Sequence, residues 1–310
     1  YMSTIEGKNF VLTNLVAEVA NSYYELLALD NQLEIVQQSI SLQKNALEIV
    51  KIQKEATRAT ELAVKKFEAE VLKSQSLEFE ILQNIKVTEN KINFLLARFP
   101  QNIPRDRSSF LTSVPGAVSS GVPSQLLSNR PDIKRAELEL VAAKLDVKVA
   151  RAEFYPSLDI TAVLGLQSFK PAYLLTLPES LLFSVAGDLT APLINRNAIK
   201  AEFSNANARQ VQAIYNYERS ILNACLEVST QLSKIENVGK SYELKAKQVD
   251  ALTQSIDIAN DLFKSSRADY FEVLMTQRDA LESKLELVET KKEQMTAMVN
   301  VFRDLGGGWR

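Results

Sequence analysis

The sequence predicts a mainly α-helical fold with a small β part, in which very long antiparallel helical hairpins of the coiled-coil type accompany a pair of β-strands. All nine prolines lie between Pro100 and Pro192. Because proline breaks helix interiors, the blocks 1–99 and 193–305 are free to form very long helices. Their apolar residues recur at steps of three and four, whereas a period of two replaces this spacing after Pro156.

The block 1–99 is expected to form the first long helical hairpin. Its apolar residues make a narrow seam, the pattern of helices that pack side by side. A single helix of this length would extend about 150 Å, so a reversal is required, and we expect it near residues 56–61, which are small and polar. The seam residues are Leu29, Leu33, Val36, Ile40, Leu47 and Val50.

The block 193–305 is expected to form a second long hairpin with its tip near residues 265–270, followed by the tail 306–310. Its seam repeats steps of three and four. The seam residues are Val249, Leu252, Ile256, Ala259 and Phe263.

The two expected tips carry similar nonapeptides, ATRATELAV at 56–64 and SSRADYFEV at 265–273, at an offset of 209 residues. The same offset pairs Glu18 with Glu227 and Leu96 with Leu305, far from the tips. Heptad-like helices raise the number of such matches by themselves. A gapless register over some 90 positions nevertheless favours an internal duplication.

A connecting segment and a third helix are expected between the two blocks. Residues 100–130 are rich in Pro, Ser and Gly, which is typical of a surface connection. Residues 131–155 are expected to be helical, because Pro131 suits a first helical turn and Asp132 complements the helix N-terminus. The seam of this helix is Ile133, Ala136, Leu140, Ala143, Val147 and Ala150.

Residues 156–192 are expected to form a β-hairpin with strands at 157–168 and 182–191. One face is apolar, and the strands are long enough to cross a bilayer when tilted. A water-soluble hairpin with one buried face is the alternative. Because two strands cannot close a sheet and lipid requires every strand edge to be paired, a membrane location implies a barrel shared between copies of the chain. The apolar face holds Leu158, Ile160, Leu164, Leu166, Phe183, Val185 and Leu189.

The composition argues against several classes of function. A net charge of −2 and a pI near 5.6 give no basic field for nucleic acid. The chain has no histidine, no glycine-rich phosphate loop and no nucleophile motif, so we expect neither an enzyme nor a metal site or cofactor. The lone Cys225 is expected to be a small buried side chain. No apolar stretch reaches the length of a membrane-spanning helix.

Several segments resemble one known family, the TolC-like outer membrane factors, and most closely the lipoprotein branch that serves resistance-nodulation-division pumps. The resemblance covers nearly the whole chain and keeps the family's order. It is carried by LTNLVAEVANSYYELLALDNQLE, by LLSNRPDIKRAELELVAAKLDVKVARAEFYPSLDITAVLG, and by ADYFEVLMTQRDALESKLELVETKKEQMTAMVNVFRDLGGGWR.

The resemblance implies an efflux channel that transports small molecules across the bacterial outer membrane as part of a tripartite pump. It implies a homotrimer, in which each chain gives strands to one β-barrel in the lipid of the outer membrane and helices to a tube in the periplasm. A periplasmic adaptor protein and an inner-membrane pump would be its partners. Internal duplication is also a trait of the family.

The resemblance also assigns roles to residues. The two tips would contact the adaptor, Glu272 would belong to an acidic ring at the periplasmic aperture, and the polar strand face would line the barrel lumen. The alternative for Glu272 is a solvated surface glutamate without a role in the pore. The alternative for Arg58 and Arg267 is likewise a pair of surface arginines without a binding role. The tip residues are Thr57, Arg58, Ala59, Thr60, Ser266, Arg267, Ala268 and Asp269, and the lumen residues are Asp159, Thr161, Gln167, Ser184, Asp188 and Thr190.

The sequence departs from the family pattern at several points. Thr57 and Ser266 stand where the family usually has a tip glycine, Met275 stands at the next acidic aperture position, and Ala63 matches Glu272 in the first repeat. Since the strands of the first repeat would lie ahead of Tyr1, we expect the chain to be the C-terminal portion of a longer protein, without its signal sequence and lipidated cysteine. A structural coiled-coil scaffold or tether is the alternative function, although it would have no need of the strand pair.

Overall fold

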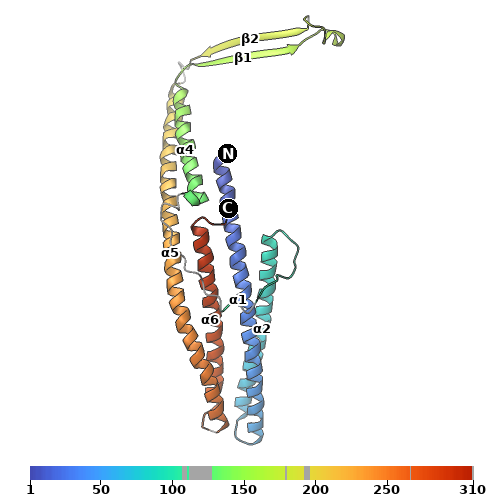
Figure 1. Cartoon of the computed structure of the whole chain (residues 1–310), viewed down its shortest axis with the longest axis vertical. Coiled ribbons are helices and arrows are strands. Elements are labelled where there is room, and N and C mark those ends of the chain that lie inside the picture. The colour runs from blue at the N-terminus through green and yellow to red at the C-terminus, as the bar shows by residue number, and fades with distance from the viewer. Residues whose placement is uncertain (107–109, 112–127, 179, 192–195, 266, 309–310) are drawn as a thin grey trace. The chain divides into compact units, whose positions relative to one another are not determined.

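The computed structural model describes residues 1–106, 110–111, 128–178, 180–191, 196–265 and 267–308. It confirms a mainly helical fold with a small β part (Figure 1). The helices and strands are α1 (Met2–Glu55), α2 (Glu61–Leu95), α4 (Pro131–Ala152), β1 (Ser157–Leu166), the 3₁₀ turn η1 (Pro171–Tyr173), β2 (Leu181–Thr190), α5 (Arg196–Lys264) and α6 (Tyr270–Asp304).

The chain divides into two compact units. Unit 1 contains Tyr1–Ile5 and Asp132–Ile221, and unit 2 contains Glu6–Pro131 and Leu222–Arg310. Unit 1 therefore holds the strands and most of α4, whereas unit 2 holds α2, α6 and nearly all of α1.

The secondary structure repeats at the offset of 209 residues. α2 and α6 are both 35 residues long, and their first and last residues, like the last residues of α1 and α5, are separated by 209 positions. The turns repeat as well, because the N–H of Arg58 donates to the carbonyl of Gln53 at 2.8 Å and the N–H of Arg267 donates to the carbonyl of Leu262 at 2.8 Å. The duplication read from side chains thus extends to the backbone.

The first tip is a helix C-cap of the Schellman type. Its second hydrogen bond joins the N–H of Thr57 to the carbonyl of Lys54 at 2.9 Å, and Thr57 has a left-handed backbone with φ of 58°. This conformation explains why a glycine would suit the position, because a β-branched residue is strained there. The matching Ser266 lies outside the described residues.

Unit 2 has its core along the apolar seams, as expected. Leu26, Leu33, Val36 and Ile40 of α1 pack with apolar residues of α2 and with Leu281 of α6 in one cluster. A second cluster lies nearer the tips, and a third surrounds Phe110. Burial of these seams supplies the main stabilisation of helices this long, since helix propensity alone contributes little.

Two expectations about burial were wrong. Cys225 is exposed on α5, because its neighbour Ala224 occupies the inward position and is fully buried. The connecting segment is not wholly at the surface, since Ile103 and Phe110 are 7% and 2% exposed and join the clusters of unit 2. Both are large apolar residues in a segment whose Pro, Ser and Gly content suggested a solvated loop.

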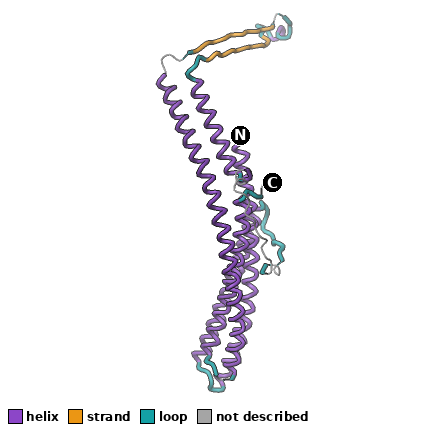
Figure 2. Tube along the Cα trace, turned by 60° about the vertical axis from the view of Figure 1, so that its left-hand side comes forward, coloured by secondary structure: helices purple, strands orange, loops and turns teal. Residues whose placement is uncertain are grey.

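In unit 1, β1 and β2 form an antiparallel two-stranded sheet, visible as paired strands in Figure 2. The seam of α4 faces inward at Ile133, Ala136, Leu140 and Ala150. Phe154 and Phe203 meet edge to face, with their ring centroids 5.9 Å apart. Among the described residues, no helix is long and apolar enough to span a membrane.

Candidate functional site

The two hairpin tips lie side by side at the same end of unit 2 (Figures 1 and 2). A single apolar cluster joins them, containing Val64 and Phe67 of the first hairpin and Ala259 and Val273 of the second. The ammonium of Lys66 on α2 also lies 5.2 Å from the ring centroid of Phe271 on α6, a cation–π contact between the hairpins. The tips therefore present one joint surface. Ala59, Phe263, Tyr270 and Leu274 pack against this apolar cluster.

This surface is polar and carries two unpaired guanidinium groups. Within the described part of the chain, the exposed side chains of Arg58 and Arg267 form no ion pair. Both are therefore available to an external acceptor, whereas Ala59 and Ala268 are half-buried. Thr57, Thr60 and Asp269 are exposed. Of the tip residues named from the sequence, Ser266 is the one on which the structure gives no information.

The first tip is held by local polar contacts. Thr60 is the N-cap of α2, and its hydroxyl accepts a hydrogen bond from the N–H of Ala63 at 3.2 Å. Lys54 and Glu61 form an ion pair across the turn. Asp269 holds the corresponding N-cap position of α6, although its side chain makes no capping hydrogen bond. The two tips thus share the hydrogen bond from Arg58 or Arg267 to the preceding helix but differ in side-chain capping.

Glu272 and Met275 lie in the first two turns of α6. Glu272 is exposed, and its N–H donates to the carbonyl of Asp269 at 3.1 Å. Met275 is half-buried. Ala63, which matches Glu272 in the first repeat, is completely buried, so the first hairpin has no acidic group at this matching position.

The strand pair separates polar from apolar side chains in the way the alternation predicts. The register sets Asp159 opposite Asp188 and Ser157 opposite Thr190 on one face, and Leu158 opposite Leu189 and Leu164 opposite Phe183 on the other. Thr161, opposite Ala186, and Ser184, opposite Val163, share the polar face. Gln167 follows the end of β1, where its N–H donates to the carbonyl of Ser180 at 2.8 Å.

Both faces of this sheet are open to solvent within the chain. On the apolar face, Leu164, Phe183 and Val185 are 78%, 76% and 76% exposed. A soluble hairpin would cover such side chains with a core, so the alternative of one buried face does not hold within the described residues.

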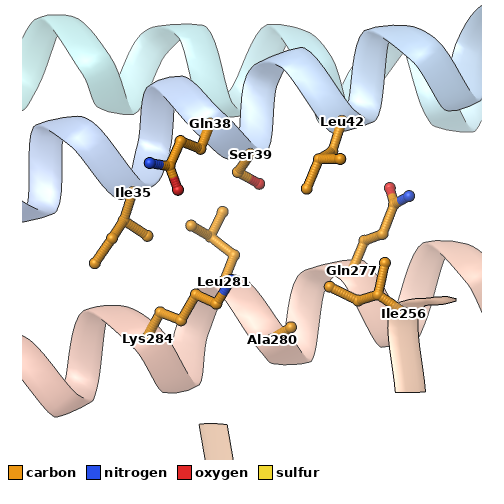
Figure 3. Close-up of a pocket in the computed structure, with 9 residues that line it drawn as sticks. All are labelled: Ile35, Gln38, Ser39, Leu42, Ile256, Gln277, Ala280, Leu281 and Lys284. Carbon is orange, nitrogen blue, oxygen red and sulfur yellow. The ribbon is translucent and has the colours of Figure 1, made fainter. Parts of the chain in front are cut away.

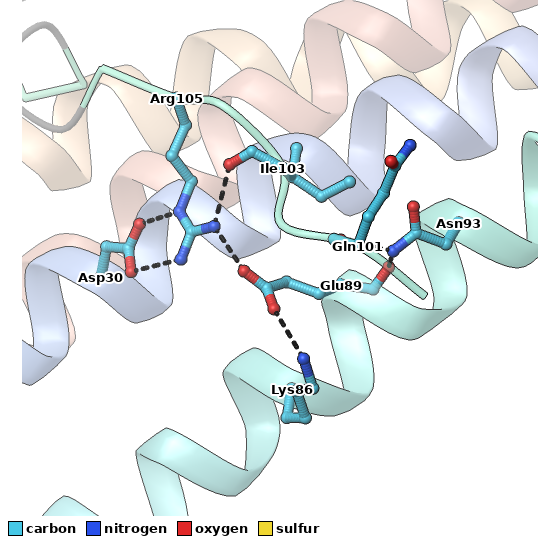
Figure 4. A network of polar contacts seen from close by, with 7 residues as sticks. All are labelled: Asp30, Lys86, Glu89, Asn93, Gln101, Ile103 and Arg105. Atoms are coloured by element: carbon cyan, nitrogen blue, oxygen red, sulfur yellow. Dashed lines mark hydrogen bonds and ion pairs between the residues drawn. The ribbon is translucent and has the colours of Figure 1, made fainter. Parts of the chain in front are cut away.

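An ion network holds the connecting segment to the first hairpin (Figure 4). The Arg105 guanidinium donates from Nε and Nη2 to the two carboxylate oxygens of Asp30 on α1, the second bond being 3.0 Å, and from Nη1 to Oε1 of Glu89 on α2 at 2.7 Å. Nη1 also donates to the carbonyl of Ile103 at 3.1 Å. The hydrogen bond with Asp30 raises the pKa of Arg105. Lys86 pairs with Glu89 at 3.5 Å.

Sequence reasoning missed this network. Its signal was an acidic residue, Asp30, between the seam residues Leu29 and Leu33 of α1, and a second one, Glu89, on the buried side of α2. The partner was not visible in the sequence, because Arg105 lies in a segment without periodicity.

Arg130, which begins the RPD segment, forms hydrogen bonds with α5 and with the end of α6 inside unit 2. Its Nη1 donates to the backbone carbonyl of Asp304 at 2.9 Å, and its Nη2 donates to Oε2 of Glu227 on α5 at 2.8 Å. Gly306 packs against the same corner with φ of 84°, and a Cβ there would lie 2.5 Å from the backbone oxygen of Asn129. Arg130 and Gly306 therefore hold the residues just before α4 against the end of α6.

The sequence profile of the outer membrane efflux protein family matches residues 122–307. Over its whole length the chain is 27% identical to the toluene efflux pump outer membrane protein TtgI of Pseudomonas putida, and over 298 residues it is 28% identical to the pyoverdine export outer membrane protein OpmQ of Pseudomonas aeruginosa. The alignments cover 100% and 96% of the chain. They cover 66% of TtgI and 62% of OpmQ, so the chain spans just under two thirds of these relatives.

Among solved structures, the outer-membrane channel OprN superposes with a TM-score of 0.90 over 99% of the chain and 69% of its own, at 22% identity. This likeness establishes the fold. The family profile covers more than half of the chain, and the chain therefore belongs to the outer membrane efflux protein family.

Proposed function

We propose that this chain is part of the outer-membrane channel of a tripartite efflux pump, in which it exports small molecules to the exterior. The observation that carries the proposal is the β1–β2 sheet, whose polar and apolar faces are both uncovered in the single chain. An exposed apolar face of this kind requires lipid or another protein surface. In a shared barrel, the leucines and Phe183 would face lipid, and the polar face would line a water-filled path.

In this proposal, each of three copies contributes β1 and β2 to one closed barrel. Closure would pair the outer edges of β1 and β2, whose backbone groups would otherwise stay unpaired in lipid. The lumen would be lined by Asp159, Thr161, Gln167, Ser184, Asp188 and Thr190. Because Asp159 and Asp188 are directly opposite, we expect the lumen to favour cations over anions.

Substituted cysteines test this assignment. In a Cys225→Ser background, Ser184→Cys is expected to react with a water-soluble, membrane-impermeant maleimide, whereas the adjacent Val185→Cys is expected to react with lipid-soluble maleimide only. The two positions are consecutive in β2 and differ in the face they occupy. Equal reaction of both with the water-soluble reagent would contradict a barrel wall at this position.

We further propose that the joint tip surface docks onto a periplasmic adaptor protein, with the inner-membrane pump beyond it. The guanidinium groups of Arg58 and Arg267 support this, since they form no ion pair with the described residues and leave charge for a partner's carboxylates or carbonyls. Cysteines at Thr60 and Asp269 are expected to crosslink to the adaptor in cells. A cysteine at the exposed Gln83, farther along α2, is the matched control and is expected to remain uncrosslinked.

At the aperture, the exposed Glu272 of each copy would form a ring of carboxylates, bordered by Met275. Glu272→Gln is therefore expected to reduce the preference of the channel for cations, measured as the reversal potential across a planar bilayer in a salt gradient. An unchanged reversal potential would leave Glu272 as a solvated surface residue.

The choice of cargo is proposed to lie outside this chain. Relatives named for toluene and for pyoverdine align over almost all of it, although those two molecules differ greatly in size and polarity. A wide path lined by small polar groups discriminates weakly between such molecules. A structural scaffold without transport is the competing function. The maleimide experiment at Ser184 and Val185 distinguishes the channel from the scaffold.

A further inference from the structure

The packed interior of unit 2 contains a level at which polar side chains replace apolar ones. Gln43 of α1, Ser74 of α2 and Gln277 of α6 are 1%, 2% and 5% exposed. Gln43 fills the seam position between Ile40 and Leu47, where the apolar residues show one step of seven in place of a step of three and a step of four. These residues define a polar layer between the apolar cluster around Leu281 and the one nearest the tips.

The amides of this layer are not satisfied by the protein. Among the described residues, Oε1 of Gln277 and both amide atoms of Gln43 have no hydrogen-bond partner. A buried amide without a partner costs about 1–3 kcal/mol, so native proteins rarely leave one in this state.

A small cavity of about 30 Å³ lies beside Gln277, between α1, α5 and α6. Figure 3 shows its side chains converging from these helices, with the amide of Gln277 directed toward α1. Its lining combines the apolar Leu42 and Ile256 with polar groups of Gln38, Ser39 and Lys284. Gln38 and Leu42 are exposed, so solvent reaches its mouth.

We propose that this cavity is an internal hydration site, whose ligand is an ordered water molecule donating a hydrogen bond to Oε1 of Gln277. Its volume exceeds the ~10–15 Å³ that one water requires. The hydroxyl of Ser39, the amide of Gln38 and the ammonium of Lys284 supply the further polar partners that a buried water needs.

The site makes the polar layer the weakest level of contact between α6 and α1. At the apolar levels on either side, separating the helices exposes buried hydrocarbon, whereas at the hydration site water is already present and the amides can bond to more of it. Local opening of α6 should therefore begin near Gln277 rather than near Val288.

The test compares Gln277→Leu with Gln83→Leu, a matched change at an exposed glutamine of α2. Gln277→Leu is expected to slow amide hydrogen exchange in peptides spanning residues 274–284 by about five- to tenfold, and to raise the melting temperature by roughly 2–4 °C, because an apolar side chain replaces a hydrated amide. Gln83→Leu is expected to change neither quantity.

A crystal structure of the native gene product supplies the second measurement, with an ordered water expected within about 3.2 Å of Oε1 of Gln277. Faster exchange and a lower melting temperature for Gln277→Leu would overturn the inference, as would an amide bonded directly to a neighbouring side chain. Neither readout depends on export, so a failed channel assay and a failed hydration site remain distinguishable.

Discussion

Removal of the Arg105 side chain should destabilise unit 2 more than any surface substitution. In the side chains of Asp30, Glu89 and Arg105, 0%, 8% and 10% of the surface is exposed, so both carboxylates are held away from water around one guanidinium. Arg105→Ala deletes three charge-assisted hydrogen bonds to them and one to the carbonyl of Ile103. The carboxylates of Asp30 and Glu89 then remain buried near each other without the positive charge and the hydrogen bonds that Arg105 supplies.

Breaking one partner of a buried ion pair costs about 3–5 kcal/mol, and we expect Arg105→Ala to lose an amount in this range from the free energy of unfolding. Arg105→Lys keeps the charge but loses the two-pronged contact with Asp30, so its loss should be smaller, about 1.5–3 kcal/mol. Arg58→Ala, at an exposed arginine without an ion pair in the described chain, is the control and should stay within about 0.5 kcal/mol of the native value.

The assay is urea unfolding followed by circular dichroism, with hydrogen exchange of residues 101–106 as a local readout. A triple variant, Arg105→Met with Asp30→Asn and Glu89→Gln, should recover part of the loss, because the charges that Arg105→Ala strands are then absent. A loss below about 1 kcal/mol for Arg105→Ala, together with unchanged exchange of 101–106, would refute the claim that this network fixes the connecting segment.

Four further substitutions have defined outcomes. Gly306→Ala should destabilise the chain, because Gly306 has a φ of 84° and the added Cβ would lie 2.5 Å from the backbone oxygen of Asn129. Gly239→Ala should instead stabilise the chain by about 0.5–1 kcal/mol, because Gly239 lies inside α5 and the added Cβ would have Nε2 of Gln294 at an ordinary contact distance of 3.7 Å. Thermal unfolding of the two variants tests both predictions. Thr57→Gly should raise the melting temperature, since relief of the left-handed strain, about 1–2 kcal/mol, exceeds the entropic cost of glycine; a lower melting temperature would show that the Thr57 hydroxyl contributes more than the strain costs. Burial raises the pKa of the Asp304 carboxyl, and the charge of Glu227 raises it too, whereas Arg303 and Arg130 oppose the shift. The folded chain therefore holds this proton more tightly than the unfolded chain, and stability is lost as the pH rises through the raised pKa. Asp304→Asn should therefore gain stability relative to the native chain between about pH 4 and neutrality in pH-dependent urea unfolding, and a constant difference would contradict the assignment.

The long helices and the strand pair could be predicted because each depends on local regularities. Proline-free blocks with steps of three and four, such as the run from Leu29 to Val50, specify helices that pack side by side. The alternation from Leu158 to Leu166 specifies a strand with two unlike faces, and the register with β2 preserves that separation. The hairpin turns could be located because small polar residues interrupt both seams at the same offset.

The contacts that fix the connecting segment could not be predicted in the same way. Arg105 and Arg130 act on partners far away in the chain, Asp30 and Asp304, and no spacing rule links residues across an aperiodic segment. The exposure of Cys225 was misjudged because the neighbouring Ala224 satisfied the same apolar position, one residue earlier. The buried position of Gln43 was not predicted, because the seam was identified from apolar residues alone and a glutamine at a seam position was therefore skipped.

The central claim is that strands β1 and β2 form part of the wall of a pore shared between copies of the chain. Cryo-electron microscopy of the native gene product in lipid nanodiscs tests this most directly. We expect three copies around one axis, with Asp159 and Asp188 facing a continuous water-filled path and Leu164 and Phe183 facing lipid. A sheet folded back onto its own subunit, or an assembly without a central opening, would contradict the account.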